Sequence, residues 1–124
     1  MGMAAGDSPS NFPPAPSVGT DLHSVLPVAS EDLGGGFRVV SVEYYDLGLI
    51  VRWLASLPVD DWSPFPPVTV ADDVATEYRY TSGGTFGHAT ALRGDTLFRA
   101  TPPPAASLLT ISHRDGSVTV GLAG

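Results

Sequence analysis

Cysteine and lysine are both absent from this 124-residue sequence, and each absence excludes a set of chemistries. Without cysteine the chain has no disulfide, no thiolate nucleophile and no cysteine-ligated zinc or iron–sulfur site, which is compatible with a reducing compartment. All six basic residues are arginine, so a Schiff-base lysine, a P-loop lysine and a lysine general base are excluded as well. The fold must therefore be stabilised by packing.

Long apolar runs are also missing. No segment approaches the roughly 20 apolar residues that a membrane-spanning helix needs. The N-terminus has neither the basic region nor the apolar region of a secretory signal. We therefore expect a cytoplasmic protein that does not enter a membrane.

Positive charge is scarce, since thirteen acidic residues against six arginines give a net charge of −7. No basic cluster is visible along the sequence. Affinity for a nucleic-acid backbone depends on neutralising several phosphates, and anionic membranes likewise attract basic segments. The sequence therefore predicts neither a nucleic-acid partner nor a membrane partner.

The composition divides the chain into a tail and a domain. Residues 1–24 are rich in Pro, Gly, Ser and Ala and predict a disordered tail, because such a segment cannot bury enough apolar area to offset its ordering entropy. Residues 25–124 predict one folded domain. At the junction, the apolar residues of segment 22–28 favour either a short edge strand interrupted by Pro27 or a one-turn helix.

Short strand patterns fill the predicted domain. A hairpin over Phe37 to Tyr45 and Leu47 to Leu54 is followed by further strands, and Asp115-Gly116 marks a final hairpin turn. The glycine-rich segment Thr81 to Gly94 predicts a mobile loop. About seven strands without an amphipathic helix predict an all-β, antiparallel, immunoglobulin-like β-sandwich, with Trp53 as its buried aromatic residue. The other predicted strands are Val68 to Ala71, Thr76 to Tyr80, Asp95 to Ala100, Ser107 to Ser112 and Ser117 to Leu122.

Several motifs of this domain follow a familiar order, namely Leu26-Pro27-Val28, Val42 to Asp46, Ile50 to Trp53 and Val68 to Tyr78. Over about residues 25–122 the chain resembles small uncharacterised β-sandwich proteins of high-GC actinobacteria, and it is similar to immunoglobulin-like domains of bacterial anti-sigma-type proteins. The resemblance implies a fold and an actinobacterial source, and it brings no catalytic residues. The chain departs from the pattern at Val74-Ala75, where such relatives have Leu-Gly in a tight turn.

Acidic residues form the densest polar group, comprising Asp60, Asp61, Asp72, Asp73 and Glu77. Loops of a sandwich could bring these carboxylates to one end, where backbone carbonyls and water could complete a calcium site. The alternative, which the absence of an EF-hand spacing favours, is that Asp72 and Asp73 accept backbone N–H bonds in a turn.

Catalytic signatures are missing. The sequence has no Gly-x-Ser-x-Gly motif, and His23, His88 and His113 predict solvent-exposed positions in a tail, a loop and a turn, without metal-ligand spacing. We therefore expect no enzyme, no bound metal and no cofactor.

Trp62 and Phe65 stand out because they lie in a proline-rich crossover where no strand pattern explains them. Together with Asp60 and Asp61 they form the predicted partner-binding residues, since rigidly held aromatics lose little entropy on binding. The alternative is that both aromatics cap the open end of the sandwich. The first hypothesis is a non-enzymatic domain that binds another protein or itself, and the alternative is a carbohydrate- or small-ligand-binding module.

Overall fold

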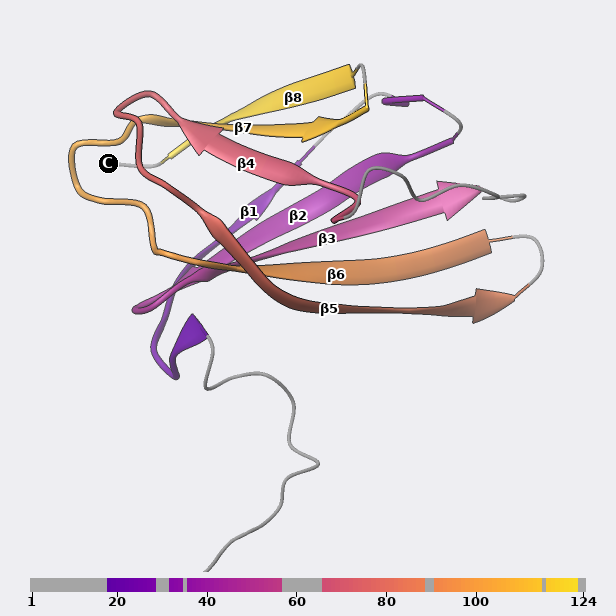
Figure 1. Cartoon of the computed structure of the whole chain (residues 1–124), viewed down its shortest axis with the longest axis horizontal. Helices are drawn as coiled ribbons and strands as arrows, with labels where there is room; N and C mark the ends of the chain where they lie inside the picture. Colours follow the sequence, from indigo (N-terminus) through magenta and orange to yellow (C-terminus); the bar gives the residue numbers. More distant parts are fainter. Residues whose placement is uncertain are drawn as a thin grey trace, which may run out of the picture.

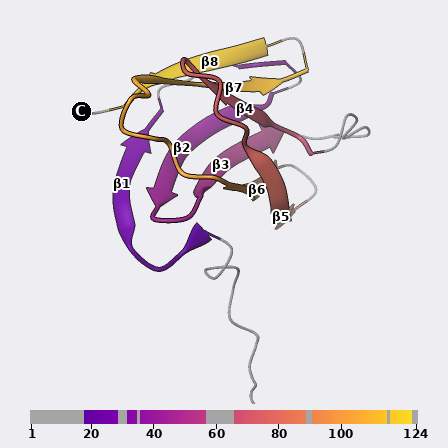
Figure 2. The same cartoon turned by 60° about the vertical axis from the view of Figure 1, so that its left-hand side comes forward.

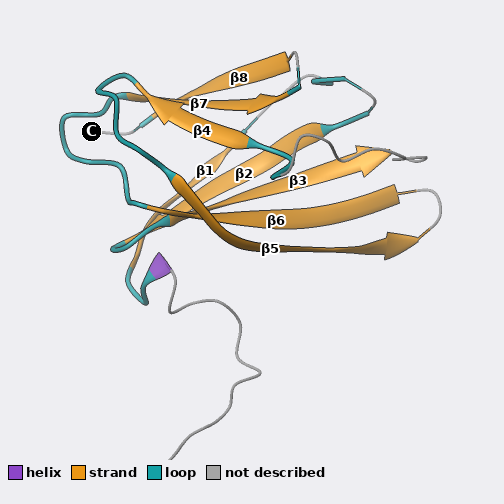
Figure 3. Ribbon diagram, in the orientation of Figure 1, coloured by secondary structure: helices purple, strands orange, loops and turns teal. Residues whose placement is uncertain are grey.

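A computed structural model describes residues 18–28, 32–34, 36–56, 66–88, 91–114 and 116–122. All eight of the elements in this part of the chain are β-strands, and they form two facing antiparallel sheets (Figures 1 and 3). None of the described residues belongs to a helix long and apolar enough to cross a membrane.

The larger sheet has five strands in the order β1-β2-β3-β6-β5. Figure 2 shows β1 and β5 at its opposite edges, with the second sheet stacked over its inner face. The five strands are β1 (Leu22–Pro27), β2 (Arg38–Tyr45), β3 (Leu49–Ser56), β5 (Arg79–His88) and β6 (Ala91–Arg99).

The smaller sheet has three strands in the order β4-β7-β8, namely β4 (Thr69–Asp72), β7 (Leu108–His113) and β8 (Gly116–Gly121). Strands β2 to β8 thereby reproduce the two-sheet order of a constant-type immunoglobulin domain, ABED against CFG. The predicted immunoglobulin-like sandwich is confirmed. It has eight strands rather than about seven, because segment 22–28 forms β1 beside β2 and not a one-turn helix.

Trp53 is fully buried at the centre of the core, as predicted. Its ring stacks on Phe37 at a centroid distance of 4.9 Å, and Phe37 stacks on His113 at 3.7 Å. Its indole Nε1 donates a hydrogen bond to Thr96 Oγ1 (3.1 Å). Because Phe37 precedes β2 and His113 ends β7, this aromatic stack connects the two sheets.

The prediction that His113 is solvent-exposed is therefore wrong. Only 8% of its surface is accessible, and Nδ1 donates to the carbonyl oxygen of Pro67 (2.7 Å). The imidazole ring can be buried because its apolar face packs against Phe37 and its Nδ1 has a hydrogen-bond partner in the backbone before β4.

The described residues of the glycine-rich segment, 81–88 and 91–94, belong to strands of the β5–β6 hairpin and not to a loop, so this prediction is also wrong. At two of its positions, Gly83 and Gly94, close approach of a neighbouring group requires glycine. A Cβ at Gly94 would overlap the Trp53 ring, and a Cβ at Gly83 would lie 2.7 Å from the carbonyl oxygen of Asp95. Glycines inside a strand mark such close contacts as readily as they mark flexibility.

The predicted boundary of the tail at residue 24 is too far along the chain. Val18 is buried and packs against Ile50 and Leu97 on the outer face of the five-stranded sheet. Its carbonyl oxygen accepts a hydrogen bond from the N–H of Leu47 (2.8 Å). Residues 18–24 therefore belong to the folded domain, whereas residues 1–17 lie outside the described part.

Candidate partner-binding site

The partner-binding residues predicted from the sequence, Asp60, Asp61, Trp62 and Phe65, lie outside the described residues. Their role stays a prediction. The same holds for the carbohydrate-binding alternative, because it used the same aromatic and acidic side chains. The described residues present other candidates, on the outer face of the five-stranded sheet and beside β5.

Five of the six arginines lie on the outer face of the five-stranded sheet. Each of them neighbours, in sequence, a residue that faces the core, and strand alternation then turns the arginine outward. The five are Arg38 on β2, Arg52 on β3, Arg79 on β5, and Arg93 and Arg99 on β6. The strands of this face carry only two carboxylates, Glu43 and Asp95.

The sequence shows no basic cluster, but strand pairing brings arginines that are far apart in sequence onto one face of the sheet. A signal was nevertheless present in the sequence. Four of these arginines directly adjoin an aromatic residue that faces the core, as Arg52 adjoins Trp53 and Arg99 adjoins Phe98. In a strand, such a pair predicts an arginine on the outer face.

Arg52 is the centre of an ion-pair network on this face. Its Nε donates to Glu43 (2.7 Å) and its Nη1 donates to Asp95 (3.3 Å), while the hydroxyl of Tyr45 donates to Glu43 (3.1 Å). The hydrogen bond from Arg52 lowers the pKa of Glu43 despite its partial burial. The Arg52 side chain is 43% exposed, so it can also contact a partner.

A hollow of about 320 Å³ adjoins this network on the same face. Its walls include Arg52 and Arg93 together with the exposed aliphatic side chains of Val40 and Leu54. The register of β2 shifts between Val39 and Ser41, which makes Val40 the extra residue of a bulge. Asp95 also lines the hollow, which therefore combines two arginines and one carboxylate with exposed apolar surface.

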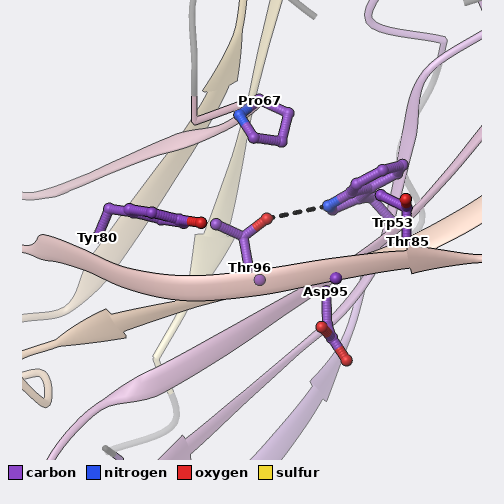
Figure 4. Close-up of a pocket in the computed structure, with 8 residues that line it drawn as sticks. Trp53, Pro67, Tyr80, Thr85, Asp95 and Thr96 are labelled. Atoms are coloured by element: carbon purple, nitrogen blue, oxygen red, sulfur yellow. Dashed lines mark hydrogen bonds between the residues drawn. The ribbon is translucent and has the colours of Figure 1, made fainter. Parts of the chain in front are cut away.

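A second pocket, of about 190 Å³, lies on the inner side of the edge strand β5 (Figure 4). The rings of Trp53 and Tyr80 and the side chain of Pro67 line it, together with Thr96 and the β5 residues Gly83 to Thr85. In Figure 4, Asp95 points away from the Trp53–Thr96 hydrogen bond, on the opposite side of β6. The lining is mostly apolar and is shared between the core and the sheet edge.

The acidic turn after β4 has a structural role, as the turn interpretation predicted. Asp72 accepts hydrogen bonds from the N–H groups of Val74 (2.9 Å) and Thr76 (3.0 Å) and from the hydroxyl of Tyr78 (2.8 Å). Burial raises the pKa of Asp72, but hydrogen bonds from the side chain and backbone of Thr76, from Tyr78 and from Val74 outweigh burial and lower the pKa from 3.8 to about 2. The turn forms without the expected glycine, because Ala75 adopts a φ of 63°.

The five predicted carboxylates are not brought together as one site within the described residues. Asp73 accepts from the N–H of Ser107 (2.9 Å), and Glu77 lies 3.7 Å from Arg79, while Asp60 and Asp61 lie outside. No group of three metal-ligating side chains occurs in the part of the chain that the structure describes. The alternative that the acidic loops bind calcium stays a prediction.

Comparisons with family models, with curated proteins and with solved structures found no match to this chain. The resemblance to actinobacterial sandwich proteins and to anti-sigma-type domains therefore stays a prediction. The functional hypothesis depends on the geometry of the site.

Proposed function

We propose that this domain is a non-enzymatic protein-binding module that holds an acidic segment of another protein against the outer face of its five-stranded sheet. The observation that supports it is the gathering of five arginines on one face of a chain whose net charge is −7. Such a separation of charge steers an acidic partner to one face and repels it from the remaining surface.

The apolar part of the face supports a protein partner over a nucleic acid. Val25, Val40 and Leu54 are each more than 40% exposed. Register places Val25 opposite Glu43 and Leu54 opposite Arg93, so these aliphatic side chains lie among the charges of the outer face. Aliphatic groups beside arginine suit a peptide with both acidic and apolar residues, whereas single-stranded nucleic acid favours exposed aromatic platforms.

Binding can be tested by selecting a displayed random-peptide library on the purified domain and measuring the affinity of the selected peptides. We expect peptides rich in Asp and Glu with interspersed apolar residues. A single-stranded DNA oligonucleotide of equal charge serves as the competing ligand. If the oligonucleotide binds as tightly as the peptides, or if selection gives no acidic peptides, the proposal fails.

The matched variants are Arg93→Gln on the outer face and Arg114→Gln in the β7–β8 turn, which remove the same charge. A hydrogen bond to a charged group contributes about 1.5–3 kcal/mol, so Arg93→Gln should weaken binding by about tenfold or more. Arg114→Gln should leave the affinity within about twofold, because only the weak long-range charge term changes. Equal losses of affinity for both variants would mean that net charge alone, and not a contact with Arg93, accounts for the effect.

A further inference from the structure

Strand β5 is an edge strand without the usual protection against pairing. It has ten residues, and in the described part of the chain it pairs with β6 alone. The opposite edge, β1, ends in Pro27 and has an irregular register, and the edge strand β4 has only four residues. Prolines, irregularities and short length are the devices that block an edge. From Ser82 to His88, β5 has none of them and pairs regularly with β6.

Glycines make this edge accessible to another backbone. Gly83 and Gly84 are consecutive and exposed, and a side chain at Gly84 would meet only the Asp95 carboxylate, at 4.0 Å. An incoming strand therefore finds little side-chain bulk beside the backbone of β5. Strand addition derives its affinity from main-chain hydrogen bonds and its specificity from pockets for alternate side chains.

The pocket of about 190 Å³ lies where such alternate side chains would point. Gly83 and Thr85 pair with Thr96 and Gly94, on the inner face of the sheet, and they border the pocket with Trp53 and Tyr80 (Figure 4). Every second side chain of an added strand faces this side. An apolar side chain there would fill space between the strand edge and the core.

The outer face of the same two strands carries the matching charge. Arg79 lies on β5, and Arg93 and Arg99 lie on β6, one strand further in. Two strand spacings measure about 10 Å, a distance that a glutamate and an arginine side chain span together. Asp95 lies on the same outer face opposite Gly84, so the acidic side chains of an added strand would meet arginines toward the two ends of β5, where Phe86 pairs with Arg93 and Arg79 pairs with Arg99, and an uncharged residue suits the position beside Gly84.

We infer that the partner binds as an additional strand on β5, in an extended segment that alternates acidic residues on the outer face with apolar residues on the inner face, one of which enters the pocket beside Trp53. The inference rests on the proposed function and specifies its partner. A second copy of the chain is a poorer occupant, because its β5 has no carboxylate to offer to the arginines of the outer face.

The test uses a selected acidic peptide and two N-methylated versions of it, methylated at alternate backbone positions. An added strand offers every second N–H to its neighbour, so one version should lose affinity by about tenfold or more and the other should not. In the domain, Thr85→Phe fills the pocket and should weaken binding similarly, while Ser82→Phe, on the outer side of the same strand, serves as its control.

Amide hydrogen exchange provides a measurement that needs no variant. Peptide binding should slow exchange at residues 82–87, whose edge N–H groups gain partners. If Arg93→Gln weakens binding more than Arg114→Gln does, but neither methylated peptide, nor Thr85→Phe, nor exchange in β5 shows an effect, strand addition is wrong and the proposed function stands. If Arg93→Gln has no effect, the proposed function fails. If light scattering shows that the domain is a dimer and that Thr85→Phe makes it a monomer, the occupant of the β5 edge is a second copy of the chain and the inference is wrong.

Discussion

Trp53 and Gly94 face each other across strands β3 and β6, and the indole ring occupies the space that a side chain at position 94 would need. The bulk of the buried Trp53 ring therefore leaves room only for glycine at position 94. This pairing explains why one position of the β5–β6 hairpin, Gly94, requires glycine.

We predict that Gly94→Ala destabilises the domain by about 1–3 kcal/mol, because the added methyl group overpacks the core against the ring. Urea unfolding followed by tryptophan fluorescence measures the change. Gly84→Ala is the matched control, since its Cβ would touch only the Asp95 carboxylate at 4.0 Å. Similar losses for both alanines would mean that the Trp53 contact does not account for the effect.

The Trp53–Thr96 hydrogen bond predicts a second result. Thr96→Val keeps the shape of the side chain but leaves the buried indole N–H without this acceptor, which should cost about 1–3 kcal/mol. In a Trp53→Phe background the same substitution should cost much less, because the donor is gone. A double-mutant cycle of unfolding free energies provides the comparison, and equal costs in both backgrounds would rule out the coupling.

The pH dependence of stability should depend on Asp72. Its folded-state pKa of about 2 lies below the ordinary 3.8, so its contribution is present above about pH 4 and is lost as the pH falls through about 2. Asp72→Asn should therefore unfold more easily at neutral pH and show a flatter profile in this acid range. Tyr78→Phe removes one donor and should reproduce part of the change. Denaturant midpoints measured from pH 7 to pH 2 test this, and parallel profiles for all three proteins would contradict it.

The N-terminal boundary predicts a difference between two truncations. Deleting residues 1–16 should change stability little, whereas deleting residues 1–20 removes Val18 from its site on Ile50 and Leu97 and should cost about 1–3 kcal/mol. Thermal midpoints compare the two. Val18→Ala in the full chain should show a loss in the same direction, and equal midpoints for all forms would place Val18 outside the cooperative fold.

Much of the fold could be predicted from local sequence, because the two hairpins at Asp46 to Gly48 and at Asp115-Gly116 combine turn chemistry with alternating strands. Local sequence also predicted the buried Trp53 and the Asp72 turn, whose contacts lie within a few residues. The β5–β6 hairpin was missed because the contacts that require glycine there are not local: Gly94 packs against Trp53, about 40 residues earlier in the chain. The arginine face was missed for a similar reason, since the pairing of β3 with β6 across a long separation is needed to bring Arg38 and Arg52 onto one face with Arg93.

The most direct test of the binding proposal is chemical-shift mapping of the isotope-labelled domain during titration with a selected acidic peptide. We expect the perturbed amides to cluster on β2, β3, β5 and β6, around Arg38, Arg52 and Arg93. All of these chemical-shift changes should become smaller as salt is added, because salt screens the charges and weakens binding. Strands β4, β7 and β8 should stay nearly unchanged. Perturbations centred on the three-stranded sheet, or spread evenly over both sheets, would contradict a partner site on the arginine face.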